Sequence, residues 1–183
     1  RAMLKPRQAI AYLPDKLAAS GETDQKMEQT SLQAELALEV GDLNLAEAAA
    51  VEMRKIDAED PRGLAVQARL ASLHGDDETA RRLLQTANQV LERQIVQRTG
   101  RNGKPSNYLK PDRERAVCRS AAWLRQWELA YVWACKGVEC APHEPISHLL
   151  KAQVIIERAE EQALCNDLQV VVHAPGEDVL GEK

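Results

Sequence analysis

Aromatic side chains are scarce in this 183-residue chain: they make up 3% of it, and Phe does not occur. Strands favour aromatic and β-branched residues, so this composition argues against a fold built on a sheet. Ala dominates the 44% of hydrophobic residues instead, which is typical of helices that pack closely through small side chains. No apolar run approaches the roughly 18 residues that a membrane-spanning helix needs. We therefore predict an all-α protein without membrane contact.

The chain also lacks a strong excess of charge of one sign. It has 24 Lys and Arg against 28 Asp and Glu, a formal net charge of −4, which argues against a surface that generally attracts nucleic acid. The four cysteines form no dense framework, and the N-terminal residues predict no secretory leader. Reduced thiols in a cytoplasmic protein are therefore expected, and no cofactor is predicted.

Gly, Pro and Asp residues divide the chain into helical segments. Over 25–40, Leu32, Leu36 and Val40 recur at four-residue intervals, as on one face of a helix. Gly41 is expected to end this helix and Asp42 to cap the next one. The same order of signals predicts further helices, over 43–57, 62–73, 77–95, 113–125, 128–139 and 146–159. Residues 168–172 are ambiguous between a helix end and a short strand.

One short pattern recurs after 34 residues: GDLNLA at 41–46 returns as GDDETA at 75–80. At 34-residue steps, and with a 16-residue insertion at 95–110 removed, the first helices align small residues: Ala34, Ala68, Cys118 and Ala152. A second position in the first helices aligns Ala37, Ala71, Ala121 and Ile155. The second helices align Ala46, Ala80 and Ala130, with Leu164 breaking the pattern. Small residues recurring in this way indicate paired helices in close contact.

These positions resemble tetratricopeptide repeats, a family with small residues in both helices of a unit, often Gly-Asp at the turn and Pro at the close. Gly41-Asp42 and Gly75-Asp76 match the turn, and the third unit matches at Cys118, Ala130, Trp127, Gly137 and Pro142. The sequence departs from the family pattern at three points. Arg125 replaces the turn Gly, Pro61 lies later than the closing Pro of the family, and the first helix of units one and two lacks the usual aromatic residue. An unrelated antiparallel bundle with coincident Ala spacing is the alternative.

The resemblance implies a right-handed superhelix of three to four antiparallel helix pairs. It covers 27–94 well, 111–144 fairly and 145–173 weakly. The expected organisation is a lead-in at 1–25, two units at 26–94, a basic Gly-rich insertion loop at 95–110, a third and a degenerate fourth pair at 111–173, and a flexible tail at 174–183.

The resemblance further implies a non-catalytic scaffold whose concave surface, lined by the first helices, binds a partner peptide or helix. The positions that would face this groove carry Glu35, Arg62, Arg69, Arg115, Arg119 and Trp123. The Arg residues would hold carboxylates of an acidic partner by bidentate hydrogen bonds, and Trp123 would anchor an apolar side chain. The alternative is a set of ordinary solvated charges, some of them pairing Glu with Arg across units.

A second candidate interface is the insertion, which carries cations and a tyrosine at Arg98, Arg101, Lys104, Tyr108 and Lys110. Contacts from these residues to a nucleic-acid backbone or an acidic partner would weaken with salt. The alternative is a solvated surface loop. The run RTGRNGKPSN is not a phosphate loop, because it lacks the Gly-Lys-Ser/Thr ending and follows no strand.

Zinc-ligand residue types gather at Cys135, Cys140, His143 and His148. Their spacing matches no common zinc finger, and cysteines that pack as small apolar residues are the alternative. A Cys nucleophile with a His base lacks an orienting third group, so no enzymatic activity is predicted. The apolar segment with Ile146, Leu150, Ile155 and Ile156 predicts a capping helix, further repeats or self-association.

Overall fold

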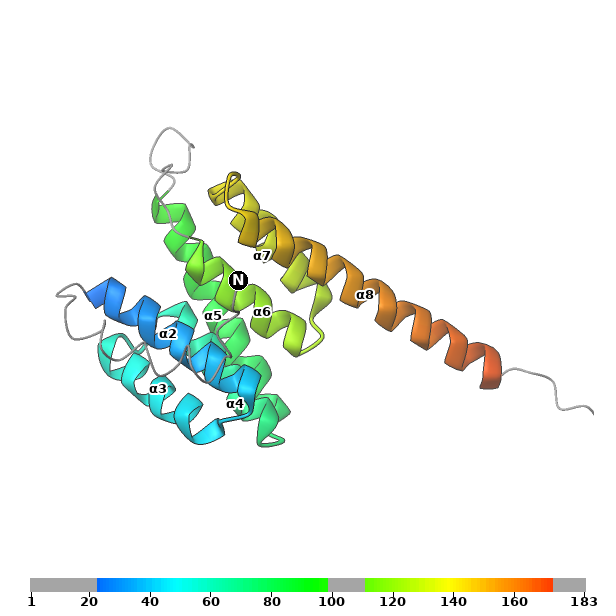
Figure 1. Cartoon of the computed structure of the whole chain (residues 1–183), viewed down its shortest axis with the longest axis horizontal. Coiled ribbons are helices and arrows are strands. Elements are labelled where there is room, and N and C mark those ends of the chain that lie inside the picture. Colours follow the sequence, from blue (N-terminus) through cyan, green and yellow to red (C-terminus); the bar gives the residue numbers. More distant parts are fainter. Residues whose placement is uncertain (1–22, 99–110, 173–183) are drawn as a thin grey trace, which may run out of the picture.

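The computed structural model describes residues 23–98 and 111–172, and within these ranges the regular elements are all helices (Figure 1). There are seven: α2 (Thr23–Val40), α3 (Leu43–Ile56), α4 (Pro61–Leu73), α5 (Asp77–Arg98), α6 (Asp112–Trp123), α7 (Trp127–Cys140) and α8 (Pro145–Val172). The predicted all-α class is confirmed for the part of the chain that is described. No helix there is long and apolar enough to cross a membrane.

The helices pack as consecutive pairs, α2 with α3, α4 with α5 and α6 with α7, and α4 joins the pairs. Val66 and Leu70 of α4 belong to a core cluster shared with α2 and α3. Leu64 and Ala68, on the same helix, belong to a second cluster shared with α5, α6, α7 and α8. One helix therefore buries two faces, which is why α4 is the most enclosed element of the fold.

The turns within the three pairs have one conformation. Gly41, Gly75 and Arg125 have φ values of 75°, 81° and 55°, the left-handed region that ends helices. In each turn the next amide bonds back to a first-helix carbonyl: Asp42 to Ala37 at 2.9 Å, Asp76 to Ala71 at 2.9 Å, and Gln126 to Ala121 at 2.8 Å. The third turn thus keeps the geometry of the first two although its left-handed residue is not Gly.

Small residues occupy the contacts between paired helices, as the 34-residue register predicts. Six aligned positions are completely buried, at Ala34, Ala68, Cys118, Ala46, Ala80 and Ala130. A larger side chain at any of them would force the helix backbones apart. Sequence spacing alone therefore located the tightest contacts of the fold.

The fourth pair predicted over 145–173 is wrong, because α8 is a single helix from Pro145 to Val172. The residue aligned with Gly41, Gly75 and Arg125 is Ala159, and no Gly or Pro occurs between Ile146 and Val172. Ala is the strongest helix former, so the backbone continues through the position where the other pairs turn. Residues 168–172, ambiguous in sequence, are helical. Figure 1 shows α8 (orange to red) continuing past α7.

The insertion begins later than predicted, since α5 continues to Arg98 and 95–98 are helical. The run from Asp77 to Arg98 contains no Gly or Pro, so nothing in the sequence ends the helix at residue 95. The remainder of the predicted loop lies outside the described residues. So do most of the predicted lead-in and all of the predicted tail.

Candidate binding pocket

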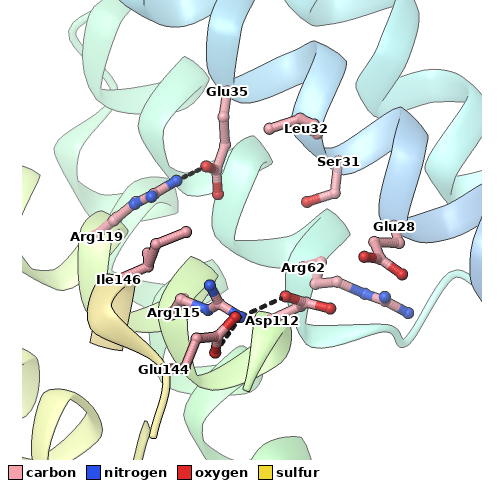
Figure 2. Close-up of a pocket in the computed structure, with 10 residues that line it drawn as sticks. All are labelled: Glu28, Ser31, Leu32, Glu35, Arg62, Asp112, Arg115, Arg119, Glu144 and Ile146. Carbon is pink, nitrogen blue, oxygen red and sulfur yellow. Dashed lines mark hydrogen bonds and ion pairs between the residues drawn. The ribbon is translucent and has the colours of Figure 1, made fainter. Parts of the chain in front are cut away.

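An open cavity of about 330 Å³ lies where the first helices of the three pairs come together with the turn before α8 (Figure 2). Helix α4 contributes one lining residue, and α2 and α6 contribute most of the others. The lining consists of Glu28, Ser31, Leu32, Glu35, Arg62, Asp112, Arg115, Arg119, Glu144 and Ile146. We call this cavity the charged pocket.

Helical spacing explains how α2 and α6 present these side chains. On α2 the lining residues recur at intervals of three and four, which places them on one face. The neighbouring face of α2 carries the core residues Met27, Ala34, Ala37 and Leu38. On α6, Asp112, Arg115 and Arg119 have the same spacing. Burial of one face of each helix in the core therefore leaves the charged face toward the cavity.

An ion pair between Arg119 of α6 and Glu35 of α2 spans the pocket (Figure 2). The Arg119 side chain is 34% exposed and the Glu35 side chain 11% exposed. Burial lowers the pKa of the Arg119 guanidinium, but an arginine keeps its charge at neutral pH. The pair therefore satisfies two charges that face each other from separate helix pairs.

Arg115 links α6 to the turn before α8. Its Nη2 donates to Asp112 Oδ1 at 2.9 Å and to Glu144 Oε2 at 3.0 Å. Its Nε also donates to the carbonyl of Pro111 at 3.3 Å. Arg115 is thus held by two carboxylates of its own chain, one of them 29 residues away.

Arg62 lies at the floor of the pocket in a buried ion pair. Its Nε and Nη2 donate to the two carboxylate oxygens of Asp60, each at 2.9 Å. Asp60 also caps α4 by accepting from the Arg62 amide at 2.9 Å, and the Nε of Arg113 lies 3.3 Å from Asp60 Oδ2. The side chains of Arg62 and Asp60 are both only 3% exposed. The pair between Asp60 and Arg113 joins the start of α4 to α6, so Asp60 has a structural role.

The lining carries four carboxylates and three guanidiniums, an excess of one negative charge. Among these charges stand two aliphatic side chains, Leu32 at 47% exposure and Ile146 at 48%. Exposed aliphatic groups in a charged cavity offer apolar contact to a ligand while the surrounding charges limit what can enter. The lining of the pocket therefore offers a ligand anionic, cationic and apolar groups, and is not predominantly cationic.

Arg69 and Trp123 lie outside the pocket lining and pair with each other. The Arg69 guanidinium carbon stands 4.8 Å from the centroid of the Trp123 ring, a cation–π distance. Arg69 is 7% exposed, and its Nε has no hydrogen-bond partner among the described residues. Burial lowers the pKa of Arg69, and the charge of Glu39 opposes this shift. Trp123 remains 47% exposed, so its other surface is accessible.

The structure therefore divides the predicted contact residues. Glu35, Arg62, Arg115 and Arg119 line one cavity, whereas Arg69 and Trp123 form a separate stacked pair. Sequence reasoning did not single out Ser31, Leu32, Asp112, Glu144 and Ile146 as contact positions. The helical spacing of Leu32 and Asp112 relative to predicted residues was a usable signal for those two. Glu144 and Ile146 reach the pocket only through the placement of the turn before α8.

Of the second predicted interface, only Arg98 falls in the described part of the chain, as the last residue of α5. Arg101, Lys104, Tyr108 and Lys110 lie outside the described residues. Nucleic-acid contact through these residues stays a prediction.

The zinc-type residues are not assembled into a site. Within 23–98 and 111–172 there is no group of three or more His, Cys, Asp or Glu side chains that could hold a metal ion. His148 Nε2 lies 2.8 Å from the Pro142 carbonyl, and His143 is exposed. Cys135 and Cys140 are half-buried, and burial, reinforced by the nearby carboxylates of Glu114 and Glu139, raises the pKa of Cys140 to about 11.

Comparison with known proteins returned no relative: no protein family, curated protein or solved structure matches this chain.

Proposed function

We propose that this chain is a non-catalytic binding module of tetratricopeptide type that takes a segment of a partner protein into the charged pocket. The repeat assignment is supported by three turns of one conformation, at Gly41, Gly75 and Arg125, and by small buried residues at matching positions of the three pairs. Stacked pairs of this kind form a right-handed superhelix that exposes its first helices on a concave side.

The observation that carries the proposal is the pocket itself. Its lining comes from four elements that are distant in sequence, and it has two half-exposed aliphatic side chains, Leu32 and Ile146. Each of these half-exposed side chains forgoes about half of the roughly 1.5–3 kcal/mol that full burial of an aliphatic side chain provides. A partner side chain placed between them would bury both.

The charges select the partner. Arg119, Arg115 and Arg62 already have carboxylates of this chain as partners. A carboxylate ligand would have to displace one of these, whereas a cationic side chain would meet an excess of negative charge. The proposed ligand is therefore a peptide segment with a basic residue next to an aliphatic one, in place of the acidic segment that the Arg pattern predicts.

Two thiols support a non-catalytic role. Burial raises the pKa of Cys118 to about 12, with smaller effects from Cys135 and Glu157, and Cys140 has a pKa of about 11. Nucleophilic cysteines have depressed pKa values, because the thiolate is the reactive form. The pKa values of Cys118 and Cys140 are raised instead, so neither thiol is an activated nucleophile.

The test is selection of short random peptides on the full chain, followed by affinity measurements on the selected sequences. Enrichment of basic–aliphatic motifs is expected. Ile146→Asn should weaken binding of the selected peptides by about tenfold or more, because it removes an apolar contact without changing the charge of the pocket. Val51→Asn is the matched control, since Val51 is 53% exposed on α3 and does not line the pocket.

A second variant examines the charge preference. Glu144→Gln keeps the size of the side chain and removes one negative charge, so peptides with a basic residue should lose affinity and peptides without one should not. Equal affinity of Ile146→Asn and the wild type for the selected peptides would place the binding site elsewhere. Enrichment of acidic motifs would refute the preference for a cation.

A further inference from the structure

Helix α8 has an exposed apolar face. Leu149 is 68% exposed, Ile156 is 56% exposed and Ile155 is 48% exposed, although the same helix buries Leu150 and Val154 against the core. Lone exposed aliphatic residues are common on protein surfaces, but a contiguous group on one helix marks an interaction surface.

The spacing along this face is that of a helix–helix seam. Leu149, Ala152, Ile156, Ala159 and Ala163 follow one another at alternating intervals of three and four residues, and all five are exposed. In the sequence the same intervals continue to Asn166 and Val170, within the helix. Apolar residues alternating in this way over about three heptads are typical of a coiled-coil contact. We call residues 149, 152, 156, 159 and 163 the α8 seam.

The 34-residue register shows what this face lacks. Ala152 and Ile155 align with Ala34 and Ala37 of α2, which are completely buried in the core cluster shared with α3. In the first three pairs the corresponding face is covered by a second helix that runs back along the first. Because α8 continues through the turn position, no helix within the described residues 23–98 and 111–172 covers this face. The missing occupant is therefore an antiparallel helix.

We propose that a second copy of this chain supplies it, and that two α8 helices pair antiparallel about a two-fold axis near Val154 and Ile155. In this arrangement Leu149 faces Ala159 of the other copy, and Ile156 faces Ala152 of the other copy. The layers formed by Leu149, Ala152, Ile156 and Ala159 then each combine a large with a small residue, and Ala163 lies opposite Pro145. A parallel pair would stack Ala on Ala and Ile on Ile, leaving gaps in the Ala layers, and gaps forfeit packing energy.

Charge favours the same arrangement. Residues 145–156 contain one formal charge, that of Lys151, whereas 157–172 contain four acids and one Arg. Antiparallel pairing places the acidic half of one helix beside the slightly basic half of the other and also opposes their macrodipoles. Parallel pairing would bring the two acidic halves together.

The α8 helix is held firmly enough to present the seam. Its inner face packs against the α6–α7 pair through Leu150 and Val154 in the core. The ion pairs Arg125–Glu161, at 2.9 Å, and Arg158–Glu128, at 2.8 Å, are exposed and add little to this contact. No seam residue lines the charged pocket. Pairing through α8 and binding in the pocket are therefore separate properties, and one can fail without the other.

The first test is the mass of the full chain in solution over roughly a hundredfold range of concentration. A single helix–helix contact is small compared with the roughly 800 Å² per partner of standard interfaces, so a concentration-dependent rise from one chain to two is expected. Ile156→Lys should abolish the rise and remain helical by circular dichroism, because residue 156 is exposed in the monomer. Val51→Lys, on α3, is the matched control and should dimerise normally.

The second test determines the orientation with a short thiol cross-linker in a Cys165→Ser background. Ile155→Cys should cross-link to its own copy, since residue 155 lies near the proposed axis. Ala163→Cys should not, because antiparallel pairing places it about 27 Å from its own copy along the helix, at 1.5 Å per residue. Cross-linking of Ala163→Cys would establish a parallel pair and refute the proposed geometry.

A chain that stays monomeric at every concentration, or a dimer that tolerates Ile156→Lys, would refute the proposal. Deletion of residues 1–22 tests whether this segment, and not a second copy of the chain, covers the α8 seam. If the full chain is a monomer and the deletion variant dimerises, the N-terminal segment covers the seam instead.

Discussion

The guanidinium of Arg119 in α6 forms an ion pair with the carboxylate of Glu35 in α2, a residue 84 positions earlier in the chain. Both helices pack on α4, and the pair connects them directly across the charged pocket. Two helix pairs that are separated by a third in sequence are thereby tied together on the side where a ligand would enter.

Removal of Arg119 should destabilise the fold modestly. Arg119→Ala leaves a mostly buried Glu35 carboxylate without its partner, but the pair is partly solvated, so we expect a loss of about 1 kcal/mol in the free energy of unfolding. Urea denaturation of Arg119→Ala, Glu35→Gln and the double variant gives the coupling energy. The exposed pair Arg158–Glu128 is the comparison, and Arg158→Ala should cost less. Additive effects of Arg119→Ala and Glu35→Gln would show that the ion pair contributes nothing.

Arg125 should be replaceable by Gly with a gain in stability. Its φ of 55° lies in the left-handed region, which costs a non-Gly residue roughly 1–2 kcal/mol, whereas its ion pair with Glu161 is exposed and contributes little. Arg125→Gly should therefore raise the free energy of unfolding by about 1 kcal/mol. Arg125→Ala, which loses the ion pair but keeps the strain, should not be stabilising. Thermal and urea unfolding of both variants distinguish these effects.

Gly75→Ala provides the reverse experiment at the equivalent turn. Its φ of 81° is unfavourable for Ala, although no atom of the described residues other than its chain neighbours lies within 4 Å of the added Cβ. Conformational strain is therefore the main expected cost. A loss of about 1 kcal/mol is expected. An unchanged stability would mean that the turns relax, and would also remove the reason for the gain at Arg125.

Glu114 should make stability fall as the pH rises. The residue is 1% exposed, its Oε2 has no hydrogen-bond partner in the described part of the chain, and burial raises the pKa of the carboxyl. The neutral form is favoured in the folded chain, so this contribution to stability is complete below the ordinary carboxyl pKa. It is lost as the pH rises toward the raised pKa.

The measurement is the urea midpoint of wild type and Glu114→Gln between about pH 4 and about pH 8. The amide cannot ionise, so the variant should gain on the wild type as the pH increases. Glu92→Gln, an exposed site on α5, controls for the general change in charge. A difference between wild type and Glu114→Gln that does not depend on pH would contradict the assignment.

Thiol reactivity should differ strongly along the chain. Cys165 is exposed and should react first with a maleimide, whereas Cys118 is completely buried and should react only after unfolding. Cys140, with a pKa of about 11, is about one part in ten thousand thiolate at pH 7 and should react about ten times faster per added pH unit. Peptide mass spectrometry of timed samples gives the three rates. Equal rates in denaturant are the control.

Patterns of a few residues in the sequence predicted most of the helices and the contacts between them. They could do so because turns and close helix contacts each restrict the residue type at single positions. Gly41 and Gly75 mark turns because few other residues adopt their φ values, and Ala34 and Ala46 mark contacts because close backbones exclude larger side chains. The continuation of α8 could have been predicted in the same way, since Ala159 favours a helix over a turn. The prediction of a fourth helix pair assumed that the 34-residue repeat continues and gave no weight to this residue.

The sequence by itself determined the helical class, the turns, the small buried positions and the residue types on the exposed faces of α2 and α6. These follow from backbone preferences and from periodicity, which act over a few residues. Only the tertiary structure decided which charges meet. Glu35 and Arg119 are brought together by the packing of α2 and α6 on α4, and Glu144 reaches Arg115 through the direction of one turn. An ion pair depends on distance in space, which the sequence does not give. Arg62, Arg115 and Arg119, which the sequence predicts as contacts for a partner, therefore already pair with carboxylates of this chain in the structure.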